Sequence, residues 1–163
     1  MQEFFDAPLK DHHMREISRN AKITIPSTQN HLKALTKEGL IIREKKGIYP
    51  TYQANRENKE FKTLKKTNII QRLQEVVEKI SEKCMPQTII LFGSASRAED
   101  TEKSDIDIYV QSKEKKIDLK KERKKLKRKI NILFEENFKK LSPELKNNII
   151  NGIILDGYLE VYT

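Results

Sequence analysis

The sequence of 163 residues contains a single cysteine, Cys84, and no long apolar run. One cysteine excludes an internal disulfide framework and any zinc site built from several cysteines. No stretch approaches the roughly 18 apolar residues of a membrane-spanning helix. The N-terminus lacks a basic flank before an apolar stretch, which argues against a secretory signal. We therefore expect a cytoplasmic protein with no membrane partner.

Hydrophobic residues are also scarce, at 36%, whereas charged residues make up 35% and the formal net charge is +9. The apolar residues still come in periodic runs, which predicts a folded chain rather than disorder. Residues 113–129 contain eleven basic and three acidic side chains, so most of the excess positive charge lies in one segment. Such a segment attracts phosphate-bearing partners through its field. The alternative interpretation is a solvated helix face.

The first 56 residues predict a small helical module that ends in a β-hairpin. Apolar residues recur at helical spacing over 14–21 and over 24–38, where Pro26 suits a first helical turn. The stretches 40–45 and 48–52, each beginning with apolar residues and separated by a turn, predict two strands. An apolar cluster near the N-terminus adds a short helix, so we expect three helices followed by a hairpin.

The stretch from Ile17 to Ile42 carries this order and resembles a winged helix-turn-helix domain. The resemblance implies binding to double-stranded DNA through the outer face of the third helix and the tip of the hairpin. Side chains of the types found there contact base edges and phosphates in DNA complexes. The predicted DNA-contacting residues are Gln29, Asn30, Lys33, Arg43, Lys45 and Lys46. Some winged helices contact only proteins, which stays an alternative, and a homodimer is a fold-level analogy.

Residues 57–86 predict a helical connector, and residues 87–163 predict a second domain that alternates strands and helices. The apolar seam of the connector consists of Ile70, Leu73, Val77, Ile80 and Cys84. Within the second domain, the basic stretch over 117–130 has helical spacing. We thus predict an α+β fold: a winged helix of residues 1–56 with three helices plus a β-hairpin, a connecting helix, and a mixed sheet with flanking helices.

The residues with the clearest chemistry lie between Phe92 and Asp107. A predicted strand ends at Gly93 and Ser94, where glycine lets the backbone approach a ligand and the following turn presents N–H groups to a phosphate. Ten residues later, Asp105 and Asp107 alternate along a second strand and so share one face. Paired carboxylates repel unless a divalent cation lies between them, and Mg²⁺ binds carboxylate and phosphate oxygens. The pattern predicts metal-assisted attack on a nucleoside triphosphate.

Gly-Ser, ten residues and Asp-x-Asp together resemble the signature of the DNA polymerase beta-like nucleotidyltransferase superfamily, in particular its minimal nucleotidyltransferase branch. The resemblance implies Mg²⁺ as cofactor and ATP or another nucleoside triphosphate as substrate or ligand. The implied nucleotide-binding residues are Gly93, Ser94, Arg97 and Ser104, and the implied catalytic, metal-binding residues are Asp105 and Asp107. Several relatives pair with a toxin as antitoxins, which makes a toxin a partner that the resemblance implies.

One position departs from the pattern of this superfamily. A following strand usually supplies a third acidic residue, but the matching stretch of this sequence has Asn131 at that position. An amide offers a neutral oxygen to a metal but cannot accept a proton as a base. We therefore expect weak transfer, nucleotide binding without transfer, or a base from elsewhere, with Glu135 and Glu136 as candidates just beyond the strand.

Three functions stay open. The first, which we favour, is a Mg²⁺-dependent nucleotidyltransferase that transfers a nucleoside monophosphate to a hydroxyl of a protein, a nucleic acid or a small molecule, with a DNA-binding winged helix. The second is a DNA-binding transcription regulator whose nucleotidyltransferase-like domain senses a nucleotide with little or no catalysis. The third is a module that docks an acidic protein through its lysine-rich segment.

Overall fold

The computed structural model describes residues 1–45 and 47–162. Its internal contacts divide the chain into two compact units, Met1–Lys65 and Lys66–Thr163, and the division falls within helix α4 (Lys59–Arg72). Each unit has its own apolar core. Lys46, one of the predicted DNA-contacting residues, lies outside the described residues.

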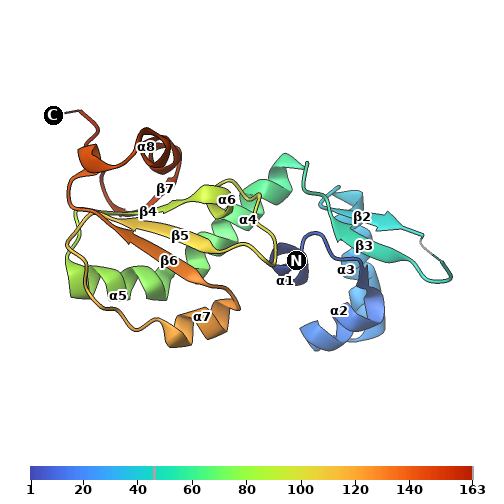
Figure 1. Cartoon of the computed structure of the whole chain (residues 1–163). Helices are drawn as coiled ribbons and strands as arrows, with labels where there is room; N and C mark the ends of the chain where they lie inside the picture. Colours follow the sequence, from blue (N-terminus) through green and yellow to red (C-terminus); the bar gives the residue numbers. More distant parts are fainter. Residues whose placement is uncertain (46, 163) are drawn as a thin grey trace. The chain divides into compact units, whose positions relative to one another are not determined.

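The first unit combines short helices with a small antiparallel sheet (Figure 1). Its elements are α1 (Gln2–Asp6), β1 (His12–His13), α2 (Met14–Ala21), α3 (Ile25–Lys37), β2 (Ile41–Glu44) and β3 (Thr51–Ala54). The strand order is β1-β3-β2, with antiparallel pairing throughout. Phe4, Leu32, Ile41 and Phe61 are among the buried side chains that form its core.

Helix α3 begins where the sequence predicts and turns its polar face to solvent. The Oγ1 of Thr24 accepts a hydrogen bond from the backbone N–H of Ser27 at 3.3 Å and so caps the helix. Thr28 and Leu32 are buried in the core of the unit. Ile25, in the first turn of the helix, is 39% exposed.

The hairpin between β2 and β3 is wider than predicted. Ile41 pairs with Ala54 and Glu44 with Thr51, so the connection takes up the residues in between. The predicted strand over 48–52 is therefore wrong in its start. Ile48 and Tyr49 are exposed in the connection rather than paired in the sheet.

The second unit is built on a four-stranded mixed sheet. Its elements are α5 (Gln74–Cys84), β4 (Thr88–Phe92), α6 (Gly93–Ser96), β5 (Ile106–Val110), α7 (Lys120–Leu126), β6 (Ile130–Phe134), the 3₁₀ helix η1 (Phe138–Lys140), α8 (Pro143–Ile150) and β7 (Ile153–Gly157). The strand order is β6-β5-β4-β7, in which β5 and β6 are parallel and the other pairs antiparallel. The mixed sheet is the one that the sequence predicts.

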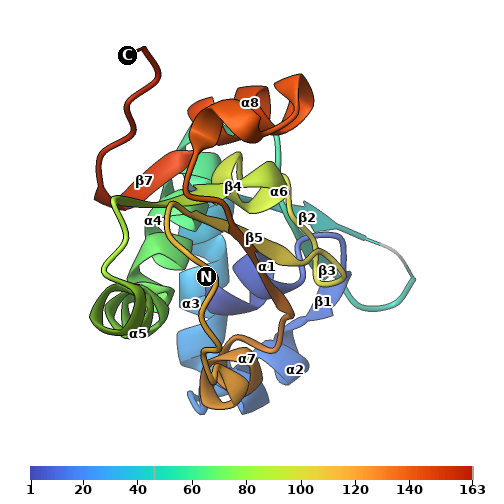
Figure 2. The same ribbon diagram turned by 60° about the vertical axis from the view of Figure 1, so that its left-hand side comes forward.

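Alternation along the strands divides the core of this unit into two layers. Helices α5 and α7 cover one face of the sheet and α8 lies on the other (Figure 1, Figure 2). Ile89, Leu91, Ile106 and Ile108 belong to the core cluster that includes residues of α5 and α7, whereas Ile90 and Tyr109 belong to the cluster that includes Ile149 of α8. The four strands therefore carry apolar residues on both faces. Asp107 in β5 and Asn131 in β6 are therefore exceptions, because they are polar residues in strands that are otherwise mainly apolar.

The helices before and after the sheet differ from the prediction in detail. The predicted connector is two helices, α4 and α5, that meet at Leu73. Ile69 rather than Ile70 completes the buried seam, because Ile69 lies four residues before Leu73 and so shares its face. The basic stretch is helical only over α7, and the residues just before and after this helix belong to neither a helix nor a strand. Within the described residues, no helix is long and apolar enough to cross a membrane.

Candidate active site

Three neighbouring strands bring the polar residues of the sheet to one end. In the strand register, Phe92 at the end of β4 lies opposite Asp107 in β5, and Asp107 lies opposite Asn131 in β6. Asp105 directly precedes β5, two residues before Asp107, so both side chains project from the same face. The predicted Gly93, which follows Phe92, lies at the same place.

Gly93 makes room for one of these carboxylates. Its φ is +74°, which is a left-handed conformation that favours glycine. A Cβ at this position would lie 2.8 Å from Oδ2 of Asp107. The turn that follows is held by the hydroxyl of Ser96, which donates a hydrogen bond to the carbonyl of Gly93 at 2.8 Å. Any larger residue at position 93 would therefore displace Asp107.

Asn131 joins the two carboxylates. Its Nδ2 donates to Oδ2 of Asp105 at 3.1 Å and to Oδ1 of Asp107 at 3.0 Å. One oxygen of each carboxylate therefore points at the same position. The Nζ of Lys129, two residues before Asn131, lies 3.6 Å from Oδ2 of Asp105. The pair of negative charges is thus met by an amide N–H₂ group and by an ammonium group.

Arg128 fixes the loop that carries Asp105. Its Nη1 lies 2.5 Å from Oδ2 of the buried Asp100, its Nε donates to the carbonyl of Ser104 at 2.7 Å, and its Nη2 donates to the carbonyl of Asp105 at 3.2 Å. The planar guanidinium thereby spans the whole loop. The sequence indicates no role for Arg128 or Lys129. Their one signal in the sequence is their position immediately before β6.

Comparison with family models matches residues 71–157 to the family described as Polymerase beta, Nucleotidyltransferase. The match covers more than half of the chain and includes the whole carboxylate site. The chain belongs to the polymerase beta nucleotidyltransferase family. A search of curated proteins finds no match to the chain. The superfamily resemblance expected from the sequence is thus confirmed.

Members of this nucleotidyltransferase family generally use a nucleoside triphosphate and a divalent metal, and the donor set of this chain fits such a cation in part. Two carboxylate oxygens already converge, and Asn131 would contribute its Oδ1 if the amide turned by half a rotation. Among the residues that the structure describes, no group of three or more His, Cys, Asp or Glu side chains is arranged to hold a metal. The site thus has two anionic ligands and one neutral one.

The other predicted nucleotide-binding residues lie around this centre with different partners. Ser94 is half-buried beside Gly93. Arg97 is partly exposed, and its Nε donates to Oε2 of Glu99 at 2.7 Å. The Oγ of Ser104 accepts a hydrogen bond from the backbone N–H of Thr101 at 2.9 Å, so this hydroxyl also stabilises its own loop.

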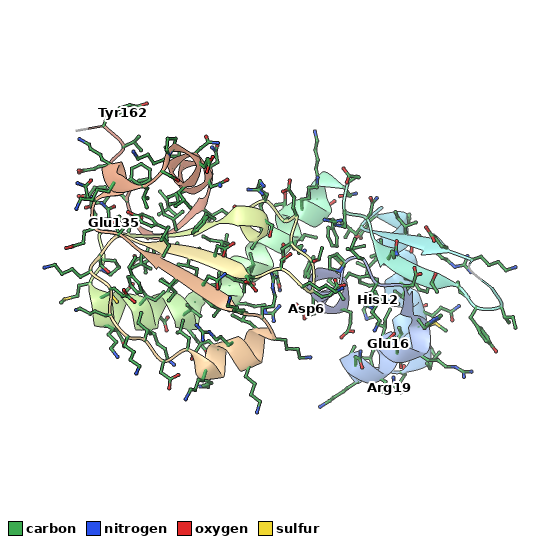
Figure 3. All side chains as sticks on the ribbon, in the orientation of Figure 1. Asp6, His12, Glu16, Arg19, Glu135 and Tyr162 are labelled. Atoms are coloured by element: carbon green, nitrogen blue, oxygen red, sulfur yellow. The ribbon has the colours of Figure 1, made fainter. Side chains whose placement is uncertain are left out.

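Glu135 and its neighbour lie at the far end of β6. Glu135 lies four positions after Asn131, which corresponds to about 13 Å along an extended strand. Figure 3 labels Glu135 at that far end. Its backbone carbonyl accepts a hydrogen bond from the hydroxyl of Tyr109 at 3.0 Å. The expectation that Glu135 or Glu136 replaces the missing base is therefore wrong, because the strand carries them away from the carboxylates.

The predicted DNA-contacting residues lie in the first unit, and three of them share one groove. Gln29, Lys33 and Arg43 line a depression of about 410 Å³ between α3 and the hairpin, together with Lys37. Asn30 and Lys45 are exposed but do not line it. The groove presents three basic side chains and one amide to solvent. Side chains of these types contact phosphates and base edges in DNA complexes.

Proposed function

We propose that the chain is a Mg²⁺-dependent nucleotidyltransferase that transfers a nucleoside monophosphate from a nucleoside triphosphate to a hydroxyl acceptor. The observation that carries this proposal is the convergence of Oδ2 of Asp105 and Oδ1 of Asp107 on one point beside Gly93. The family assignment supports nucleotidyl transfer in general. The acceptor class and the choice of nucleotide belong to the proposal.

In the transfer, an acceptor oxygen forms a bond to the α-phosphorus, the bond from that phosphorus to the bridging oxygen breaks, and pyrophosphate leaves. A bound divalent cation would neutralise triphosphate charge and act as a Lewis acid. Asp105 and Asp107 would hold it, and Gly93 leaves the space that the Asp107 carboxylate occupies. Asn131 cannot accept the proton of the acceptor hydroxyl. That proton passes to water or to a carboxylate, and we expect a low turnover rate for this reason.

The test is incubation of the purified chain with each labelled nucleoside triphosphate, with and without Mg²⁺, in cell lysate as a pool of acceptors. Transfer of label should require Mg²⁺ and should be lost in Asp107→Asn and Asp105→Asn. Glu102→Gln is the matched control, because it removes one exposed carboxylate from the same loop and should leave transfer unchanged. If Asp107→Asn transfers label as well as the natural sequence does, the proposal is refuted.

A second candidate function is a DNA-binding regulator that senses the nucleotide without turning it over. The observation that favours it is the amide of Asn131, which takes the place of a catalytic carboxylate and donates to both aspartates. The three helices and the antiparallel strands of the first unit support a winged helix. In this function, the groove lined by Lys33 and Arg43 would contact DNA. Saturable nucleotide binding without label transfer would favour this function over the first.

The DNA-binding part is tested with a fluorescent DNA duplex of mixed sequence in a salt series. We expect Lys33→Ala and Arg43→Ala each to weaken binding and to reduce the salt slope by about 1. Lys59→Ala is the matched control, since Lys59 is an exposed lysine of the same unit that does not line the groove. Equal losses in all three variants would contradict a specific role for the groove and leave only a general charge effect.

A further inference from the structure

The carboxylates of Asp105 and Asp107 both accept hydrogen bonds from a side chain of the protein itself. Both hydrogens of the Asn131 amide nitrogen are used, one on Asp105 at 3.1 Å and one on Asp107 at 3.0 Å. Lys129 adds a full positive charge 3.6 Å from the same Asp105 oxygen. These donors occupy the position on which the two carboxylates converge. The chain therefore carries its own substitute for a cation at that position.

A free divalent cation meets two obstacles at this site. It must turn the Asn131 amide so that Oδ1 replaces Nδ2, which breaks two hydrogen bonds to charged acceptors. Hydrogen bonds of that type are among the stronger ones in proteins. It must also displace Lys129, whose ammonium repels it. In return, the free cation gains only two anionic ligands and one neutral ligand.

For a cation that arrives with a nucleoside triphosphate, both costs are smaller: the cost of breaking the Asn131 hydrogen bonds and the cost of displacing Lys129. Phosphate oxygens complete its coordination, as Mg²⁺ requires in sites built from one or two carboxylates. The same phosphates offer Lys129 a new anionic partner, and its side chain is 68% exposed and free to swing toward them. The loss of the Asp105 contact is thereby offset.

We propose that Asn131 and Lys129 make cation entry conditional on the nucleotide, so that the divalent cation and the triphosphate bind as one unit and the free cation binds weakly. This inference rests on the proposed nucleotide binding at the same site. It assigns a function to the amide beyond the loss of a carboxylate. Asn131 keeps the carboxylates paired while no nucleotide is present.

The experiment is a titration of the full chain with Mn²⁺, in which electron paramagnetic resonance counts the free ion. It is run without nucleotide and with an α,β-methylene ATP analogue that cannot be cleaved at the α-phosphorus. Without nucleotide, Asn131→Asp should bind Mn²⁺ about 10- to 100-fold more tightly than the natural sequence, because a carboxylate takes the place of the N–H₂ group that donates to both aspartates. With the analogue, both proteins should bind Mn²⁺.

Lys129→Gln provides a second variant, chosen because its site is too exposed to unfold the chain. Without nucleotide it should bind Mn²⁺ up to about fivefold more tightly, as expected for one partly exposed ion pair. Lys103→Gln is the matched control, because Lys103 is an exposed lysine on the loop that leads to Asp105. It should change the affinity by less than about twofold.

The inference is overturned, with the proposed function left intact, if the natural sequence binds free Mn²⁺ as tightly as Asn131→Asp does. The part of it that concerns Lys129 is overturned if Lys129→Gln gains no affinity for free Mn²⁺. Failure of the proposed function gives a different result, because a fluorescent ATP analogue then shows no saturable binding to any of these proteins, with or without Mn²⁺. That result would overturn both statements.

Discussion

Replacement of Arg128 by methionine should destabilise the second unit strongly. The Arg128 side chain is 10% exposed and that of Asp100 is 5% exposed, so the ion pair between them is not screened by solvent as a surface pair would be. Methionine keeps most of the apolar stem but removes the guanidinium, and the Asp100 carboxylate stays buried. Breaking a buried pair in this way costs about 3–5 kcal/mol.

The expected loss is large enough to read from a thermal scan. For a unit the size of Lys66–Thr163, each kcal/mol shifts the unfolding midpoint by about 4–8 °C. Arg128→Met should therefore lower the midpoint of this unit by at least about 12 °C in differential scanning calorimetry. Arg97→Met is the matched control, because the pair of Arg97 with Glu99 is exposed on both sides and should cost under about 1 kcal/mol.

A second substitution separates the buried charge from the general loss of packing. Asp100→Asn in the Arg128→Met background removes the carboxylate that the first change leaves without its guanidinium. The double variant should regain part of the lost stability, because the buried carboxylate that has lost its guanidinium accounts for the larger part of the cost. A midpoint for Arg128→Met within about 3 °C of the natural sequence would refute this reasoning, as would a double variant less stable than Arg128→Met alone.

Three further predictions concern single residues of the second unit. Burial, with a smaller contribution from the charge of Glu135, raises the pKa of Tyr109 from 10.0 to about 12. The neutral phenol therefore contributes stability that is complete below pH 10 and is lost as the pH rises through 12; Tyr109→Phe should flatten this loss in unfolding scans, and an unchanged slope would contradict it. Ala98 has a φ of +59°, so Ala98→Gly should stabilise the chain by up to about 1 kcal/mol in urea unfolding, whereas a clear destabilisation would show that this conformation carries no strain. Gly93→Ala should push Asp107 aside and weaken binding of a fluorescent ATP analogue at least about tenfold; unchanged affinity would mean that the nucleotide does not use this turn.

The parts of the site that the sequence predicts are those that depend on local geometry. Asp105 and Asp107 share a face because a strand alternates, and Gly93 has a positive φ because the chain must turn after a buried strand. Both features follow from a few consecutive residues.

The contacts that the sequence did not predict depend on which strands pair. Lys129 and Arg128 reach the loop before β5 only because β6 lies parallel to β5, with Asn131 opposite Asp107. Nothing local in the basic stretch distinguishes these two cations from the solvated lysines around them. The wrong prediction for Glu135 has the same origin. Glu135 is only four positions from Asn131 in the sequence, but an extended strand places those positions far apart in space.

The register of β5 and β6 also has an evolutionary consequence. Position 131 lies opposite Asp107 because buried Ile130 pairs with buried Ile106. The strand pairing therefore sets the location of residue 131, and this location does not depend on which side chain residue 131 carries. Codons for asparagine and aspartate differ by one base. A single point mutation therefore separates this chain from one with three carboxylates, with the fold and the neighbouring side chains already in place. A lineage that carries this chain can exchange one form for the other in a single step, in either direction.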